Sequence, residues 1–144
     1  MKAKDIITLV EDIKRQWRTN DPYKIAKRLG IEVMHRDVTL KDFTAQIIKS
    51  ENYPTIISIN NAYTGLSKKI LCAHELGHAI LHEGCVNNFA VTSKNVASTV
   101  EYEANLFALA LLAGSNLEYK MVMPLTEMSN YLLKSIIEHN LKKD

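Results

Sequence analysis

Two histidines and one glutamate lie within five consecutive residues, His74-Glu75-Leu76-Gly77-His78, in the pattern H-E-x-x-H. Side chains four positions apart on a helix lie one turn above each other, so His74 and His78 could bind one metal ion at about 2.0–2.1 Å. Glu75 is offset by about 100° around the helix axis and could reach a water molecule beside that ion. Zinc acidifies such a water, and a nearby glutamate can take its proton and pass it to a leaving amine. The motif therefore predicts hydrolysis of a peptide bond, with Glu75 as the general base.

The residues around the motif favour a buried helix, because apolar side chains flank it at Ile70, Leu71, Ala73, Leu76, Ile80 and Leu81. Buried groups that can carry charge are costly unless they are paired or bound to a metal. Gly77 costs a helix about 1 kcal/mol relative to alanine, which indicates that another element approaches the backbone there. A metal site therefore fits this context better than the alternative, two buried histidines without a metal.

A hydrolytic zinc site needs a third protein ligand and an open fourth position. The sequence Glu101-Tyr102-Glu103-Ala104-Asn105 offers two carboxylates on a second predicted helix. Glu101 shares a helix face with Asn105, four residues later. Glu101 could therefore bind the zinc, while Asn105 orients one of the metal-binding side chains through a hydrogen bond. Glu103 points about 200° away from Glu101 and is expected to meet solvent or a basic partner. Helical phase therefore favours Glu101 over Glu103 as the third ligand.

The remaining histidines and cysteines fit other roles. His82 lies about 12 Å along the helix axis from His74, too far to share one ion, and is expected to interact with the helix end before Gly84. His35 and His139 are isolated histidines, which are more often structural than catalytic, although either could stabilise an oxyanion if it folded against the zinc. Cys72 and Cys85 are too few for a disulfide scaffold and match no common zinc spacing, so we expect reduced, buried thiols. None of these side chains is expected to bind the metal.

Hydrophobic periodicity predicts the elements that must position these residues. Apolar residues at intervals of three and four predict helices at residues 3–17, 22–29, 66–81 and 99–113, with one or two more within 117–141. Alternating and β-branched residues predict strands at residues 31–35, 44–49 and 55–60. Asp21 and Pro22 are typical of a helix start, and Gly30 is typical of a helix end. The predicted fold class is α+β, a mostly helical body with a small sheet of about three strands before the motif helix.

Length and composition exclude several classes of protein. The 144 residues, 47% of them hydrophobic, fit one globular domain at residues 1–144. The longest apolar run is far shorter than the roughly 20 residues of a membrane helix, and the N-terminus lacks the features of a signal peptide. A net charge of +2 gives no sign of a nucleic-acid surface. We therefore expect a cytoplasmic protein that contacts neither membranes nor nucleic acids directly.

Three segments together resemble the ImmA/IrrE-type metallopeptidases. They are Ile57-Ser58-Ile59-Asn60, residues 70–82 around the H-E-x-x-H motif, and residues 101–108 with the pair Leu111-Leu112. The resemblance implies a zincin-like metallopeptidase domain with its metal core at about residues 55–113, one zinc ion held by His74, His78 and Glu101, and Glu75 as general base. It also implies cleavage of a repressor protein encoded on a phage or other mobile element, which would release transcription of the repressed genes.

Two other functions stay open from the sequence. A regulatory module could keep the metal fold and dock on a repressor or sense stress without hydrolysis, although such a module would not need Glu75. A DNA-binding regulator would need a helix-turn-helix, for which we see no convincing segment.

For the peptidase, the strand at residues 55–60 comes directly before the motif helix and is expected to offer an edge on which an extended substrate pairs.

Overall fold

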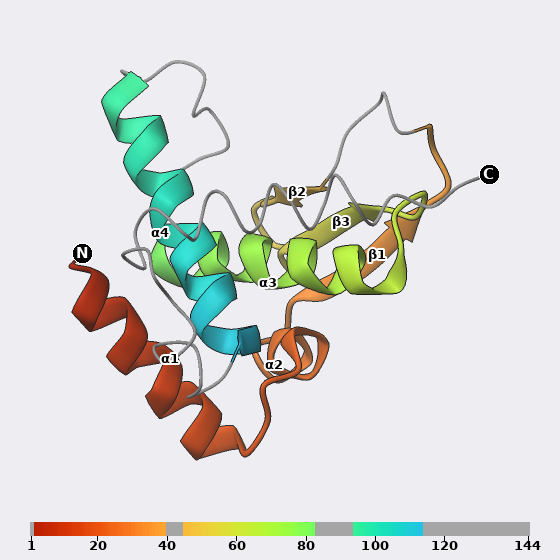
Figure 1. Ribbon diagram of the computed structural model, residues 1–144. Helices are drawn as coiled ribbons and strands as arrows, with labels where there is room; N and C mark the ends of the chain where they lie inside the picture. The colour runs from red at the N-terminus through yellow and green to blue at the C-terminus, as the bar shows by residue number, and fades with distance from the viewer. Residues whose placement is uncertain (1, 40–44, 83–93, 114–144) are drawn as a thin grey trace.

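The computed structural model describes residues 2–39, 45–82 and 94–113. In chain order its elements are α1 (Ala3–Trp17), α2 (Pro22–Arg28), β1 (Glu32–Arg36), β2 (Ala45–Ile48), β3 (Ile56–Asn60), α3 (Gly65–Leu81) and α4 (Lys94–Ala113). This arrangement confirms the predicted α+β class, with most of the described residues helical and a small sheet before the motif helix (Figure 1). None of the helices in these ranges is long and apolar enough to cross a membrane.

The sheet has three strands in the order β1-β3-β2, so β3 is the central strand. It pairs in parallel with β1, where Glu32 lies opposite Ile56, and antiparallel with β2, where Ala45 lies opposite Ile59. The prediction that this strand offers a free edge to a substrate is therefore wrong. Its β-branched side chains suit a central position, because a central strand is flanked by backbone on both sides and buried by packing helices.

The sheet and helix α4 bury the motif helix α3. One side of α3 lies on the sheet against β2 and β3, and α4 crosses its other side (Figure 1). The amphipathic helix α1 packs against α4 through its buried face, Ile6, Val10 and Ile13. Lys14 also donates a hydrogen bond from Nζ to the Ala110 carbonyl oxygen at 3.2 Å. The N-terminal helix therefore fixes α4, which in turn fixes the side chains that α4 presents to α3.

Gly77 lies where α3 and α4 come into close contact. A Cβ atom at this position would lie 3.0 Å from the Cβ of Phe107 and 3.2 Å from the Cα of Ala104. These distances are shorter than an ordinary carbon–carbon contact of about 3.5–4.0 Å. The structure thus bears out the expectation that another element approaches the backbone at this glycine.

The local signals for the ends of the helices are largely confirmed. Asp21 caps α2 by accepting a hydrogen bond from the Tyr23 backbone N–H at 2.9 Å, with Pro22 in the first turn. Gly30 follows α2 with φ of +74°, a conformation that glycine adopts without strain. Helix α4 begins at Lys94, earlier than the predicted residue 99, because its polar first residues include neither glycine nor proline to stop a helix. Gly84, Cys85, His139 and the helices predicted within 117–141 lie outside the described residues.

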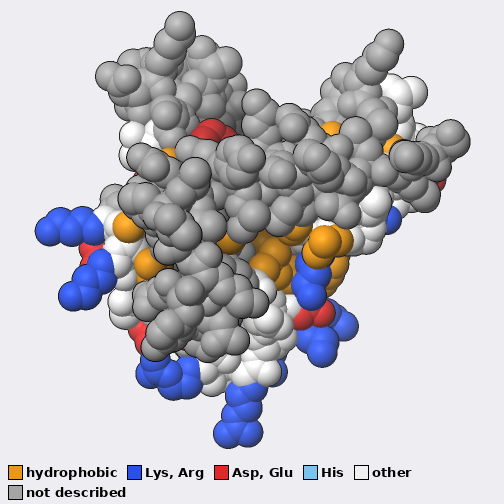
Figure 2. Space-filling view, in the orientation of Figure 1, with side chains coloured by type: hydrophobic (Ala, Val, Ile, Leu, Met, Phe, Trp, Pro, Cys, Tyr) orange, Lys and Arg blue, Asp and Glu red, His pale blue; other side chains and the backbone are white. Residues whose placement is uncertain are grey.

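On the face drawn in Figure 2, the basic side chains of the described residues do not form a single patch. The lysine and arginine side chains of the described residues project there at separate places on the rim. This distribution agrees with the small net charge of +2.

Candidate metal centre

His74 and His78 come from consecutive turns of the buried helix α3. Their side chains are almost fully enclosed, with 8% and 5% of each residue exposed. The two rings lie edge to face, with centroids 4.8 Å apart. Thr64 begins this helix by accepting a hydrogen bond from the Ser67 N–H at 3.2 Å. Burial against the sheet and α4 then holds both imidazoles on the same side of α3.

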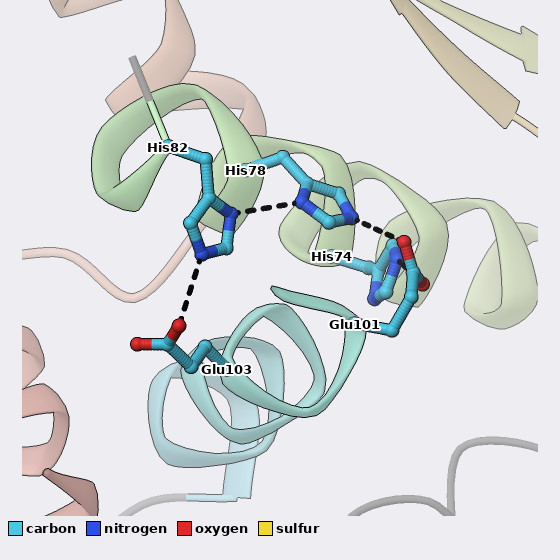
Figure 3. Close-up of polar contacts among 5 residues, drawn as sticks. All are labelled: His74, His78, His82, Glu101 and Glu103. Carbon is cyan, nitrogen blue, oxygen red and sulfur yellow. Dashed lines mark hydrogen bonds and ion pairs between the residues drawn. The ribbon is translucent and has the colours of Figure 1, made fainter. Parts of the chain in front are cut away.

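Glu101 reaches both imidazoles from α4. Its Oε2 lies 3.1 Å from His74 Nε2, and its Oε1 lies 2.9 Å from His78 Nε2 (Figure 3). One ligand atom from each of these three residues lies within 4.8 Å of the other two. The Glu101 side chain is 51% exposed, whereas the histidines are buried, so the group opens toward solvent on the Glu101 side. The three residues therefore form a group that could hold a metal ion.

The donor set fits zinc in both chemistry and size. Two imidazole nitrogens and one carboxylate oxygen are a typical ligand set of hydrolytic zinc sites. Bonds of about 2.0–2.1 Å in a tetrahedral site place neighbouring donor atoms about 3.3 Å apart. The nitrogen–oxygen separations of 3.1 and 2.9 Å are within a few tenths of an ångström of that spacing. Accommodating an ion would require side-chain movements that bring all three ligand atoms, now within 4.8 Å of one another, to that spacing.

The charges in this group are strongly coupled. Burial alone would raise the pKa of Glu101, but its hydrogen bonds to His74 and His78 outweigh burial and hold that pKa well below its usual value. Burial opposes charge on His74, but the hydrogen bond to Glu101 and the charges of Glu75 and Glu101 raise its pKa overall. The site therefore keeps Glu101 ionised, which is the form that binds a metal.

Glu75 lies on the same turn of α3 as His74 and is 9% exposed. Burial raises the pKa of its carboxyl group, while the nearby His74 and His78 act in the opposite direction. Glu101 also lies close enough for its charge to raise this pKa. The structure thus places Glu75 beside the three candidate ligands, in an environment that favours proton uptake.

Asn105 and Glu103 occupy different sides of α4. Asn105 is buried, and its side chain helps to raise the pKa of His74, as expected for a group that supports this histidine. Glu103 is buried as well, and its Oε1 lies 3.4 Å from His82 Nε2. Of the two predicted environments for Glu103, solvent or a basic partner, the structure therefore shows the basic partner, His82.

His82 follows α3 and is more closely involved in the site than the sequence indicated. Its backbone N–H donates to the His78 carbonyl oxygen, as expected at a helix end. Its ring, however, contacts His78 through Nδ1 at 3.0 Å and Glu103 through Nε2 (Figure 3). Both ring nitrogens of His82 are thus engaged, which agrees with its predicted exclusion from the metal ligands. The i, i+4 spacing between His78 and His82 is the signal that could have indicated this contact.

Two other predicted non-ligands, His35 and Cys72, are not part of the group of candidate ligands. His35 is exposed on β1, with its ring centroid 5.9 Å from that of Tyr23. Cys72 is a fully buried free cysteine in the hydrophobic core. Burial raises its pKa to about 12, so it is a neutral thiol at physiological pH.

Comparison with known proteins identifies the family to which this arrangement belongs. The family model for the IrrE N-terminal-like domain, peptidase family M78, matches residues 26–136. The chain belongs to this family. The matched residues include all three candidate ligands, Glu75 and the central strand β3. Membership confirms the ImmA/IrrE-type resemblance, and with the candidate ligand triad it supports a function of the metallopeptidase type.

A phage protein is also similar to this member of the M78 family. It is an "Uncharacterized immunity region protein 2" from Bacillus phage phi105, 28% identical over 109 residues. The match covers 72% of this chain and 65% of the phage protein, so this chain matches less than two thirds of that relative's length.

Proposed function

We propose that this chain is a zinc-dependent endopeptidase of the cytoplasm that cleaves a regulatory protein, a repressor of a phage or other mobile element. The observation that carries the proposal is the convergence of His74, His78 and Glu101 beside the buried Glu75. Membership of a peptidase family supports hydrolysis. The name of the phage relative supports a substrate encoded on a phage or other mobile element.

In this proposal His74 and His78 would hold the ion through Nε2, and Glu101 would hold it through a carboxylate oxygen. Three protein ligands are the usual number in a hydrolytic zinc site, which keeps its fourth position for water or substrate. When bound, zinc supplies Lewis acidity that makes a water nucleophilic near neutral pH and polarises a substrate carbonyl. The exposed side of Glu101 provides the direction from which a peptide can approach.

Glu75 carries the proton in this mechanism. Its carboxylate takes a proton from the attacking water, holds it, and delivers it to the nitrogen of the leaving amine. Burial raises the pKa of this carboxyl group, which favours its holding the proton between these two transfers. Asn105 supports His74 during these steps through the contact that raises the histidine's pKa.

We propose a protein as the partner, with no direct contact to nucleic acid or membrane. A net charge of +2 gives little general attraction for phosphate groups, and the described lysine and arginine side chains on the face drawn in Figure 2 lie apart from one another. A repressor is the regulatory protein that best accounts for a peptidase-family domain with a relative in a phage immunity region.

The decisive experiment incubates the purified chain with the repressor-like product of a neighbouring gene, with zinc or with a chelator. The wild-type chain should cut the repressor at one or a few sites, and the chelator should stop cleavage. Glu75→Gln should lower the rate by about 10²–10⁴-fold, the contribution of a general acid–base group, while zinc content stays unchanged. Glu51→Gln, at an exposed loop position, is the matched control and should cleave as the wild type does.

Full activity of Glu75→Gln would refute the assignment of the base. A wild-type chain that binds zinc and the repressor but leaves the repressor intact would instead support the non-hydrolytic regulatory module. Mass spectrometry of the repressor fragments distinguishes these outcomes, because hydrolysis adds one water molecule across the broken peptide bond.

A further inference from the structure

A continuous line of polar contacts joins three buried side chains, beginning at the candidate ligand His78. His78 Nδ1 lies 3.0 Å from His82 Nδ1, and His82 Nε2 lies 3.4 Å from Glu103 Oε1 (Figure 3). His78, His82 and Glu103 are each less than 9% exposed. The line runs from the inner nitrogen of a candidate ligand to a carboxylate on the opposite helix, away from Glu101.

The chemistry of imidazole restricts where the protons lie in this line. A histidine that binds a metal through Nε2 has its remaining proton on Nδ1, because the metal takes the Nε2 lone pair. His78 Nδ1–H then donates to His82 Nδ1, which must be unprotonated to accept. The proton of a neutral His82 therefore lies on Nε2, where it can be donated to the Glu103 carboxylate. The hydrogen bond from His78 thus fixes the tautomer of His82, and that tautomer places a proton on Nε2 for the second hydrogen bond, to Glu103.

We propose that His82 and Glu103 are positioning residues, which orient the His78 ring and select its Nδ1–H form so that Nε2 can bind zinc. This inference rests on the proposed metal site and adds two residues, His82 and Glu103, that act on it by orienting His78. Partners of the second ring nitrogen are a general requirement of metal-binding histidines, and removing them costs about 10–100-fold in metal affinity. Here the partner is a second histidine, and a carboxylate completes the line.

The arrangement of α4 explains why the line forms. Glu101 and Glu103 are separated by one residue, so their side chains leave α4 in directions about 200° apart. Glu101 meets the metal-facing nitrogen of His78, while Glu103 reaches the same ring from behind through His82. One helix therefore fixes both sides of the His78 ring, and the orientation of that ring depends on the crossing of α3 and α4.

The first test measures zinc affinity of the full-length chain by competition with a chromophoric chelator. His82→Leu and Glu103→Leu should each weaken zinc binding by about 10–100-fold. Glu103→Gln keeps an oxygen that accepts from His82 and should stay within about threefold of wild type. His35→Leu removes an exposed histidine on β1 and is the control, with unchanged affinity expected. Urea unfolding of the metal-free variants establishes that each one folds.

The second test determines the proton positions by nitrogen NMR of the zinc-loaded wild-type chain labelled with ¹⁵N at histidine. His82 should have a protonated Nε2 and an unprotonated Nδ1, with a scalar coupling across the hydrogen bond from His78 Nδ1. In Glu103→Leu this pattern should weaken, and in Glu103→Gln it should be retained. A purely structural role for the three side chains would not produce this response.

The outcomes separate this inference from the proposed function. A wild-type chain that binds no zinc overturns both. Tight zinc binding by the wild type that His82→Leu or Glu103→Leu leaves unchanged overturns the positioning role alone, as does a proton on Nδ1 of His82 in the zinc-loaded wild type. Because the NMR measurement uses the wild type, the inference stays testable even where a leucine variant fails to fold.

Discussion

Replacing Gly77 with alanine should force α3 and α4 apart. The new Cβ would lie 3.0 Å from Phe107 Cβ, 3.1 Å from Phe107 Cγ and 3.2 Å from Ala104 Cα. Ordinary carbon–carbon contacts are about 3.5–4.0 Å, so relief requires a movement of about 0.5 Å. Two of the three obstructing atoms are Cα or Cβ atoms, which follow the backbone and cannot rotate away. The helix α4 must therefore shift as a unit.

The cost of this shift can be estimated from two opposing terms. Overpacking a close contact costs about 1–3 kcal/mol. Alanine in place of glycine inside a helix returns about 1 kcal/mol. The free energy of unfolding of Gly77→Ala should therefore fall by about 1 kcal/mol, which corresponds to a decrease of about 2–4 °C in Tm for a chain of this size.

The same shift should weaken the metal site. His74 and His78 flank Gly77 on α3, and Glu101 lies one turn before Ala104 on α4. Zinc–ligand distances in protein sites lie within about ±0.2 Å of their usual values, a range smaller than the movement that the new Cβ demands. We therefore expect zinc affinity to fall by about tenfold, equivalent to about 1.4 kcal/mol of strain at the site.

Urea unfolding of the metal-free protein and chelator competition for zinc measure the two effects. Gly65→Ala is the matched control, because Gly65 lies in the same helix and a Cβ atom added there would meet no other atom within 4 Å. Gly65→Ala should be at least as stable as the wild type and bind zinc equally well. The reasoning would be refuted by a Gly77→Ala variant that matches Gly65→Ala in both stability and zinc affinity.

Two further predictions concern the core. Burial raises the pKa of Cys72 from 9.0 to about 12, so the folded state holds this proton more tightly than the unfolded state does. The resulting stabilisation is complete below about pH 9 and is lost as pH rises from there toward 12. In urea unfolding at pH 8 and pH 11, Cys72→Ala should therefore lose less stability than the wild type over this interval, and parallel losses would contradict the assignment. On the sheet, Ile57 is fully buried in β3, whereas Met34 on β1 is 40% exposed. Ile57→Ala should cost about 2–5 kcal/mol and Met34→Ala less than about 1 kcal/mol, and equal costs would argue against β3 as the central strand.

Much of the local structure could be predicted because its causes are local. Asp21, Pro22 and Gly30 act on the backbone within a few residues, so the bounds of α2 followed from residue type alone. The alignment of His74 and His78 also has a local cause, because the pitch of a helix places side chains four residues apart on one face. Glu101 could be preferred over Glu103 on helical phase, and the structure brings Glu101 to both histidines.

The interpretations that fail or stay incomplete depend on contacts between elements. The order of segments in the sequence suggests a free edge for the strand before α3, yet β1 and β2 flank it, because strand order depends on how distant segments pair. Residue type and helical phase describe His82 and Glu103 only within their own helices, as a helix-end histidine and a carboxylate facing solvent or a base. Their contact arises where α3 and α4 cross, and neither helix alone specifies that crossing.

The sequence by itself determined which chemical groups are available and which of them share a helix face, since both follow from residue type and the 3.6-residue repeat. It also indicated, through Gly77, that some element must come close to α3. Only the tertiary structure decided that this element is α4, at a distance that would leave a Cβ atom in tight contact with Phe107 and Ala104. That contact brings Glu101 to the outer nitrogen of His78 and places Glu103 behind it, next to His82. The metal centre is therefore a property of two helices and their crossing.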